Sequence, residues 1–344
     1  MQVSFKTKFY RIYNIERMIL MKNFMMSMGA NKIVETCVKV QPGEEVLIVT
    51  EVEKFPIAET IAEAAYAKGG KIIISVIEPR DQDSAEPPKA IAAAMKKSDV
   101  FICVVGKSIT HTVAVKEAIA NGARGVVLTQ FSETMLVTGG IECDFEHAKK
   151  ECKVVASTMA GGKEIVLTSP GGTHLTYSAE GRRGNSLYCM VEKGEFSTVP
   201  TVEANVSPVE GTANGIIVAD ASVPYIGIGV LETPIVCEVK NGFITKINGG
   251  REAEILKRDL ESKNDPNVYN VAENGIGLNP KCSFMGFMLE DEGVYGSAHI
   301  GIGTSITLGG HVKASCHYDL IMKDASLVVD GRPVLKDGKL LLEI

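Results

Sequence analysis

A histidine and an aspartate two residues apart are the strongest local indication of a metal site in this sequence. They lie in the run CHYDLIM, residues 316–322, whose composition predicts a β-strand. Residues two apart on a strand share a face, so His317 and Asp319 would project together. An imidazole and a carboxylate placed in this way can hold one metal. The same spacing also suits a hydrogen-bonded structural pair, and the motif alone leaves both interpretations open.

Three more residues of ligand type occur in the same half of the chain. His299 lies in the glycine-rich stretch AHIGIG, whose small side chains leave room for a metal or a substrate. Glu273 is expected beside a turn, after the break at Asp265-Pro266. Glu203 alternates with apolar residues and is expected to point inward from a strand, whereas its rival Glu210 is expected to face water from a turn. A buried structural histidine and a solvated loop acid remain the alternatives for His299 and Glu273.

Short β-branched runs alternate with helical stretches between residues 45 and 152, which is typical of a parallel sheet covered by helices. The predicted strands are 46–50, 71–76, 100–105 and 125–129, with 154–155 as a possible fifth. The predicted helices run from Pro56 to the Gly69-Gly70 stop, over 88–97 and over 111–120. The first strand is followed by EVEKFP rather than by a glycine-rich turn, which argues against a dinucleotide cofactor.

After about Thr158 the pattern changes to short alternating runs separated by turn dipeptides. Asn241-Gly242, Asp330-Gly331 and Asp337-Gly338 are typical of two-residue hairpin turns, and one helix is expected over 252–264. The sequence therefore predicts an α/β, Rossmann-like N-terminal domain with a parallel sheet over residues 1–157, including an extension up to about Leu20. A C-terminal α+β domain rich in antiparallel hairpins, residues 158–344, would carry the metal site.

The composition limits the classes of partner. The chain is 45% hydrophobic and 23% charged with a formal net charge of -6, and its short basic clusters are not interleaved with aromatic residues, which argues against nucleic acid. Its eight cysteines are scattered without a CxxC pair, as expected of reduced thiols in the cytoplasm. Arg17 and Lys22 interrupt the apolar stretches at the N-terminus, and no segment reaches the length of a membrane span. We expect a cytoplasmic protein that binds no membrane.

Four segments, PTVEANVSPVEGTANG, AENGIGLNP, AHIGIG and GGHVKASCHYD, occur in the order of the metal-site segments of the metal-dependent leucyl aminopeptidases of the aminopeptidase T type. The chain resembles this family from about Cys37 to its C-terminus. The same half also resembles 2,5-dihydroxypyridine 5,6-dioxygenase, notably in KNGFITKINGGREAEIL, NDPNVY and CHYD. The two families look related, so either resemblance implies the same fold and neither decides the function.

The aminopeptidase resemblance implies a site for two divalent ions (zinc, cobalt or manganese) whose ligands are Glu203, Glu273, His299, His317 and Asp319. The family's sixth ligand, a tyrosine, is replaced here by Ile306. This resemblance implies a hydrolase of amide or peptide bonds, with a short peptide or small-molecule substrate and a homo-oligomeric assembly. A metal-site carboxylate, for which we choose Glu273, would move the proton.

The dioxygenase resemblance implies one Fe(II) ion held by two histidines and one aspartate, with positions left open for oxygen and substrate. His317 and Asp319 match that pattern, but Glu273 stands where the family has its other histidine. His111 matches a histidine that handles the substrate, or is a polar residue near a helix N-terminus. We therefore predict a metal-dependent hydrolase, with the dioxygenase as the alternative. A binding protein with a vestigial site is the third hypothesis.

Overall fold

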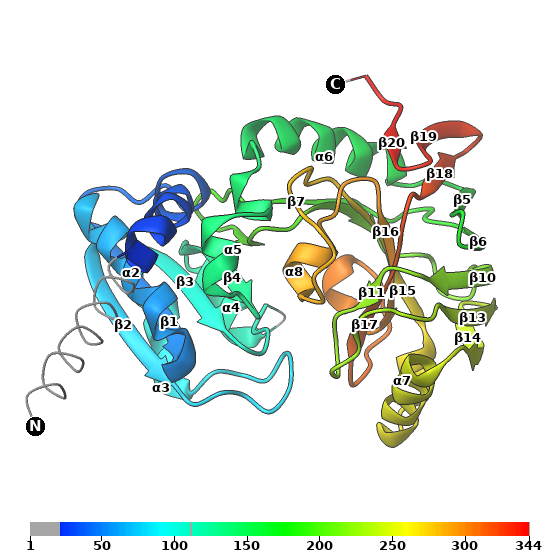
Figure 1. Cartoon of the computed structure of the whole chain (residues 1–344), viewed down its shortest axis with the longest axis horizontal. Helices are drawn as coiled ribbons and strands as arrows, with labels where there is room; N and C mark the ends of the chain where they lie inside the picture. The colour runs from blue at the N-terminus through cyan, green and yellow to red at the C-terminus, as the bar shows by residue number, and fades with distance from the viewer. Residues whose placement is uncertain (1–20, 111, 344) are drawn as a thin grey trace, which may run out of the picture. The chain divides into compact units, whose positions relative to one another are not determined.

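The computed structural model describes residues 21–110 and 112–343, and it divides into two compact units (Figure 1). Unit 1 comprises residues 1–141 and 191–196, and unit 2 comprises residues 142–190 and 197–344. The boundary expected at residue 157 falls inside helix α6 (Phe145–Met159). The division comes before this helix because α6 packs on strands β7 (Gly184–Tyr188) and β9 (Val202–Val206) of unit 2. Among the described residues, no helix is long and apolar enough to cross a membrane.

Unit 1 is built on the first four strands of a sheet whose order is β2-β1-β3-β4-β8, and β8 contributes only Phe196 to this unit. The strands of this sheet are β1 (Glu45–Glu51), β2 (Lys71–Ile77), β3 (Val100–Val105), β4 (Arg124–Thr129) and β8 (Phe196–Thr198). The first four pair in parallel, as the sequence predicts. The predicted fifth strand at 154–155 is wrong, because these residues lie within α6, where the Asp144 carboxylate caps the helix by accepting two backbone N–H groups.

The helices of unit 1 include α2 (Phe55–Ala67), α3 (Lys89–Lys97), α4 (Val113–Ala120) and α5 (Glu133–Val137), and residues 21–32 are also helical. Helix α2 has Pro56 in its first turn, buries Ile57 and Ile61, and ends before Gly69, whose φ of 85° stops the helix. Helix α4 begins after Thr112, whose side chain accepts the N–H of Val115. The predicted elements of unit 1 other than the fifth strand are therefore confirmed to within a few residues.

A buried guanidinium ties the start of β4 to the segment before β1. Arg124 donates to both carboxylate oxygens of Glu44, at 2.9 and 2.6 Å, and to the carbonyl oxygens of Val38 and Lys39. Burial tends to raise the pKa of Glu44, but the hydrogen bonds and charge of Arg124 hold it below its ordinary value. Arg124 therefore makes four side-chain hydrogen bonds, two of them to a carboxylate.

Replacing Arg124 by alanine is expected to lower the free energy of unfolding by about 2 kcal/mol, the range for hydrogen bonds to a charged group. The control is Lys96→Ala, because the Lys96–Glu117 ion pair is exposed and should contribute less than about 0.5 kcal/mol. Urea denaturation of the two variants measures both changes. Equal losses in the two variants would contradict the role given to Arg124.

Unit 2 contains two sheets, and both are largely antiparallel. The eight-stranded sheet has the order β14-β13-β10-β6-β5-β18-β19-β20, and the seven-stranded sheet has the order β12-β11-β17-β16-β15-β9-β7. The strands of the first are β5 (Ile165–Thr168), β6 (His174–Tyr177), β10 (Asn214–Ala219), β13 (Ile235–Lys240), β14 (Phe243–Asn248), β18 (Ser326–Val329), β19 (Arg332–Lys336) and β20 (Lys339–Leu340). The second adds β11 (Ser222–Val223), β12 (Gly229–Val230), β15 (Val271–Gly277), β16 (Ala298–Gly303) and β17 (His317–Met322) to β7 and β9.

The three predicted hairpin turns are confirmed. Asn241-Gly242 joins β13 to β14, Asp330-Gly331 joins β18 to β19, and Asp337-Gly338 joins β19 to β20. All six of these residues have positive φ, between 45° and 82°, as such two-residue turns require. The predicted helix over 252–264 is confirmed as α7 (Arg251–Ser262), and a short helix, α8 (Met288–Asp291), follows.

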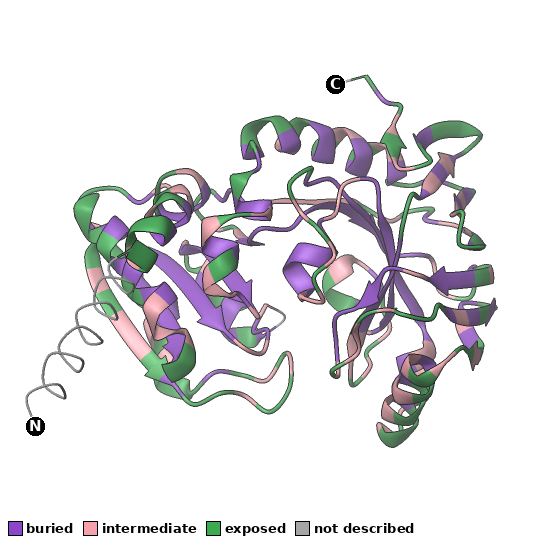
Figure 2. Cartoon of the chain, in the orientation of Figure 1, coloured by how far each residue is buried: buried purple, intermediate pink, exposed green. Residues whose placement is uncertain are grey.

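The central strands of the seven-stranded sheet are the most enclosed part of unit 2. Every residue of β9, β15 and β16 is buried, and these strands are coloured as buried in Figure 2. Polar side chains in such a place need partners, because an unpaired buried charge is costly. The five predicted metal ligands lie on these strands and on β17.

Candidate metal centre

Four neighbouring strands, in the order β17-β16-β15-β9, carry all five side chains predicted as metal ligands. Glu203 lies on β9, Glu273 on β15, His299 on β16, and His317 and Asp319 on β17. The registers place them close together, because Gly275 pairs with His299 and Gly301 lies between Glu273 and Asp319 in the two adjoining ladders. The five side chains thus converge on one face of a sheet, although Glu203 and Asp319 are 116 positions apart in the chain.

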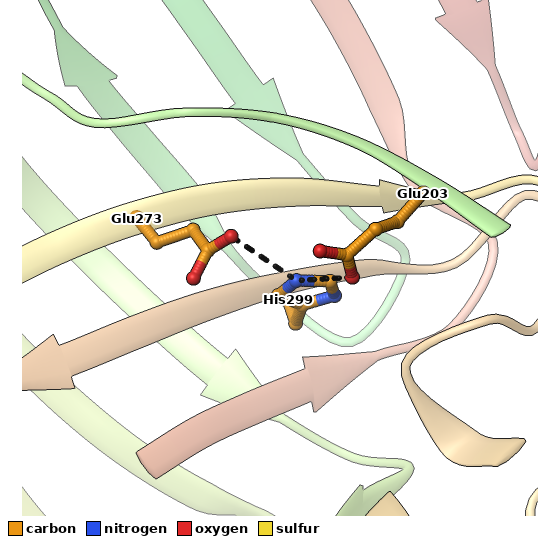
Figure 3. Close-up of side chains that lie close together, drawn as sticks. All are labelled: Glu203, Glu273 and His299. Carbon is orange, nitrogen blue, oxygen red and sulfur yellow. Dashed lines mark ion pairs between the residues drawn. The ribbon is translucent and has the colours of Figure 1, made fainter. Parts of the chain in front are cut away.

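The five side chains form two groups that share one carboxylate. In the first, His299 Nε2 lies 3.4 Å from Glu203 Oε2 and 4.0 Å from Glu273 Oε1 (Figure 3). In the second, His317 Nε2 lies 3.0 Å from Glu273 Oε2 and 3.5 Å from Asp319 Oδ1. Each group could hold a metal ion, since its ligand atoms lie within 4.8 Å of one another. Among the described residues, no such group contains both histidines.

Two glycines make room for the imidazoles. A Cβ atom at Gly275 would lie 2.0 Å from His299 Nε2, and one at Gly301 would lie 2.7 Å from His317 Nε2. Glu273, expected beside a turn, lies instead inside β15 and is buried. The turn-like sequence AENG is misleading because Gly275 serves here to admit the ring of His299 rather than to reverse the chain.

Three neighbouring groups form hydrogen bonds with the ligand side chains. Asn205 donates to Glu203 Oε1 at 2.9 Å, and Tyr225 donates to Asp319 Oδ2 at 2.6 Å. His317 Nδ1 lies 2.8 Å from the carbonyl oxygen of Thr304, which can only accept, so Nδ1 carries a proton and Nε2 faces the carboxylates. Metal-binding histidines are commonly oriented in this way.

None of these three hydrogen-bonding groups was predicted from the sequence. The spacing of Asn205 and Glu203, two apart on one strand, is a signal that could have identified the first. Nothing in the sequence connects Tyr225 with Asp319, which is 94 residues away.

The donor set fits a metal ion. Two buried carboxylate oxygens in the cluster, Glu203 Oε2 and Asp319 Oδ1, have no hydrogen-bond partner among the described residues. Each of these oxygen atoms faces a histidine Nε2, at 3.4 and 3.5 Å, without a hydrogen bond, and one cation in each group would satisfy it. Imidazole nitrogen and carboxylate oxygen together suit zinc, cobalt, manganese and iron.

Several side chains of the cluster have pKa values that are shifted from their ordinary values. Burial, together with the charges of Glu273 and Asp319, raises the pKa of Glu203 to about 7, although His299 opposes the shift. Burial also raises the pKa of Glu273. Burial alone would lower the pKa of His317, but Asp319 and Glu273 raise it well above its ordinary value. Two of the ligands, Glu203 and His317, must therefore lose protons near neutral pH before they can bind a cation.

Metal affinity is consequently expected to fall as the pH falls below about 7, by at least about tenfold per pH unit, since each displaced proton competes with the metal. Titration of the metal-free protein with zinc at pH 5.5, 6.5 and 7.5, with free metal set by a chelator, measures this dependence. An affinity that stays constant over this range would contradict proton release from these ligands.

Three other residues singled out in the sequence lie outside the cluster. Ile306, at the position of the family tyrosine, belongs to a short 3-10 helix (Ile306–Leu308) and is half exposed. Glu210 is only partly exposed and does not simply face water: it pairs with Arg182 and accepts the backbone N–H of His311 at 2.8 Å. His111 lies outside the described residues.

Comparison with known proteins places these observations in a family. The family model of 2,5-dihydroxypyridine 5,6-dioxygenase matches residues 26–342. The 2,5-dihydroxypyridine 5,6-dioxygenase of Pseudomonas putida KT2440 is 29% identical over 159 residues, which are 43% of this chain and 45% of that protein. The match therefore spans less than half the length of this curated relative.

Two solved structures share the fold. The 2,5-dihydroxypyridine dioxygenase of Pseudomonas putida KT2440 has a TM-score of 0.80 at 18% identity, covering 93% of this chain and 98% of that one. Wild-type AmpT of Thermus thermophilus, an aminopeptidase T, has a TM-score of 0.67 at 16% identity, covering 92% and 99%. At these identities the likeness shows the fold alone, and the predicted fold class, α/β followed by antiparallel sheets, is confirmed.

Proposed function

The chain belongs to the 2,5-dihydroxypyridine 5,6-dioxygenase family, and we propose that within this family it is a metal-dependent hydrolase of amide or peptide bonds with a site for two divalent ions. One observation carries the proposal: Glu273 belongs to both ligand groups, with one oxygen atom facing each histidine. A carboxylate in that position suits a pair of ions held side by side, as in many two-metal hydrolases.

The separation of the two histidines argues against a single iron centre. Ring-cleaving and other oxygenases of this kind hold one Fe(II) ion with two imidazoles and one carboxylate, so both histidines must reach the same ion. Here His299 groups with Glu203 and Glu273, whereas His317 groups with Glu273 and Asp319.

The dioxygenase remains the second candidate because the family model and the curated relative both bear that name. In this case Glu273, His317 and Asp319 would hold one Fe(II) ion, with the carboxylate of Glu273 in place of a second imidazole. The relative's name indicates a hydroxylated pyridine as the substrate to test first.

In the hydrolase, each side chain of the cluster has a defined task. Glu203 and His299 would hold one ion, His317 and Asp319 the other, and Glu273 both. Such ions polarise a carbonyl group and lower the pKa of water. Hydrolysis adds the hydroxyl of water to the acyl carbon and a proton to the departing amine. Glu273 is the carboxylate placed between the two groups, and we assign to it the transfer of that proton.

The test compares the two candidate reactions on one preparation of the protein. Samples loaded with zinc, cobalt or manganese are assayed on aminoacyl anilides, short peptides and cyclic amides. A sample loaded with Fe(II) is assayed for oxygen uptake with 2,5-dihydroxypyridine. Amide cleavage without oxygen uptake is expected. Oxygen uptake without amide cleavage would replace the first proposal by the second.

A further inference from the structure

Tyr225 is a buried residue close to the cluster that the proposed function does not use. It follows β11, the strand that pairs with β17, and only 6% of its surface is exposed. Its hydroxyl lies 2.6 Å from Asp319 Oδ2 and 3.0 Å from Glu292 Oε1. A phenol enclosed with two carboxylates requires an explanation, because an apolar side chain would fill the same space without polar contacts.

The two oxygen atoms of Asp319 have different contacts. The phenol has one proton, and the shorter of its two contacts is with Oδ2. The other oxygen, Oδ1, has no hydrogen-bond partner among the described residues and lies 3.5 Å from His317 Nε2. Without the phenol, the carboxylate could rotate about its terminal torsion, which is broad in aspartate. With it, Oδ1 stays directed at the group formed with Glu273 and His317.

We propose that Tyr225 is a positioning residue that orients Asp319 so that Oδ1 can bind a metal ion. This inference rests on the proposed metal site but not on the reaction that the site performs. Groups that hydrogen-bond to metal ligands typically change metal affinity by roughly 10- to 100-fold when they are removed. Loss of the Tyr225 hydroxyl should weaken metal binding to a similar degree.

A neighbouring tyrosine provides a matched control. The rings of Tyr225 and Tyr318 are 5.0 Å apart, and both residues are buried. The hydroxyl of Tyr318 also donates to a carboxylate, that of Asp259 at 2.9 Å, but Asp259 lies outside the metal cluster. Tyr225→Phe and Tyr318→Phe therefore each remove a hydroxyl group from one of two adjacent rings, and each removes one hydrogen bond to an aspartate.

The experiment measures cobalt and zinc binding to the wild-type chain and both variants by competition with a chelating dye. The visible spectrum of bound cobalt is recorded, and thermal unfolding of the metal-free proteins verifies that they fold. Tyr225→Phe is expected to bind one ion roughly 10- to 100-fold more weakly and to alter the cobalt spectrum. The metal affinity of Tyr318→Phe should stay within about threefold of the wild-type value. That change is smaller than the effect of removing a group that hydrogen-bonds to a metal ligand.

The outcomes distinguish the inference from the function on which it rests. A wild-type chain that binds no metal would refute the proposed function. A wild-type chain that binds metal, with Tyr225→Phe equal to Tyr318→Phe in affinity and spectrum, would overturn only the role of Tyr225. If Tyr225→Phe fails to fold, 3-fluorotyrosine at position 225 keeps the ring and hydroxyl. An unchanged cobalt spectrum with that residue would likewise overturn the role, and a shifted one would support it.

Discussion

Replacing Glu273 by alanine is expected to abolish metal binding at both positions and to lower kcat/KM by roughly a thousandfold or more. The loss combines the removal of a ligand from both groups with the removal of a proton-transfer group, which alone contributes about 10²- to 10⁴-fold. Metal analysis of the purified variant and its rate of amide cleavage measure the two effects. No other single substitution in the cluster should affect both positions, because only Glu273 belongs to both groups.

The control for this variant is Glu238→Ala. Glu238 is an exposed glutamate on β13, in the other sheet of unit 2, and forms a surface ion pair with Lys246. Its loss should change neither the metal content nor kcat/KM, since such pairs contribute little. If Glu273→Ala retains one tightly bound ion per chain, Glu273 is not the shared ligand and the two-ion account is wrong.

Each of the two histidines should be required for a different one of the two ions. His299→Ala is expected to lose the ion held with Glu203, and His317→Ala the ion held with Asp319. Each variant should therefore keep one ion per chain and bind the other more than about 100-fold more weakly. This loss of affinity exceeds the effect of removing a group that only hydrogen-bonds to a ligand. Cobalt titration followed by its visible spectrum distinguishes the two positions, because their ligands differ. The double variant should bind neither ion tightly.

The dioxygenase alternative predicts a different result for the same variants. If one iron is held by His317, Asp319 and Glu273, His317→Ala loses all of the metal and His299→Ala loses none. That asymmetry, together with one ion per wild-type chain, would favour the second candidate. A similar loss of one ion in each variant would favour the first.

Local patterns were sufficient to predict much of the fold. A two-residue hairpin turn requires positive φ at both of its positions, and Asn-Gly and Asp-Gly pairs adopt positive φ readily. Asn241-Gly242 and the two Asp-Gly pairs therefore predict their hairpins from a few neighbouring residues alone. The parallel strands were equally clear, since β3 and β4 are buried on both faces and contain the apolar runs VFICVV and VVL. Val154 and Val155 were misassigned to a strand because β-branched residues also occur on the buried side of a helix such as α6.

The candidate site was predictable only in part. His317 and Asp319 share a face by strand periodicity, which is local information. Their convergence with Glu203, Glu273 and His299 depends on the strand order β17-β16-β15-β9, which no local pattern gives. The family resemblance supplied the set of ligands but not this order. The role of Gly275 depends on its pairing with His299 across the sheet, and the contact of Tyr225 with Asp319 depends on β11. Both are properties of the assembled sheet rather than of a segment.

The number of metal ions bound per chain tests the central claim most directly. The purified protein, freed of metal and reloaded with zinc or manganese at pH 7.5, is analysed for metal content against protein concentration. Two ions per wild-type chain are expected, because two ligand groups share Glu273. A single ion per chain, lost completely in His317→Ala and unaffected by His299→Ala, would contradict the account.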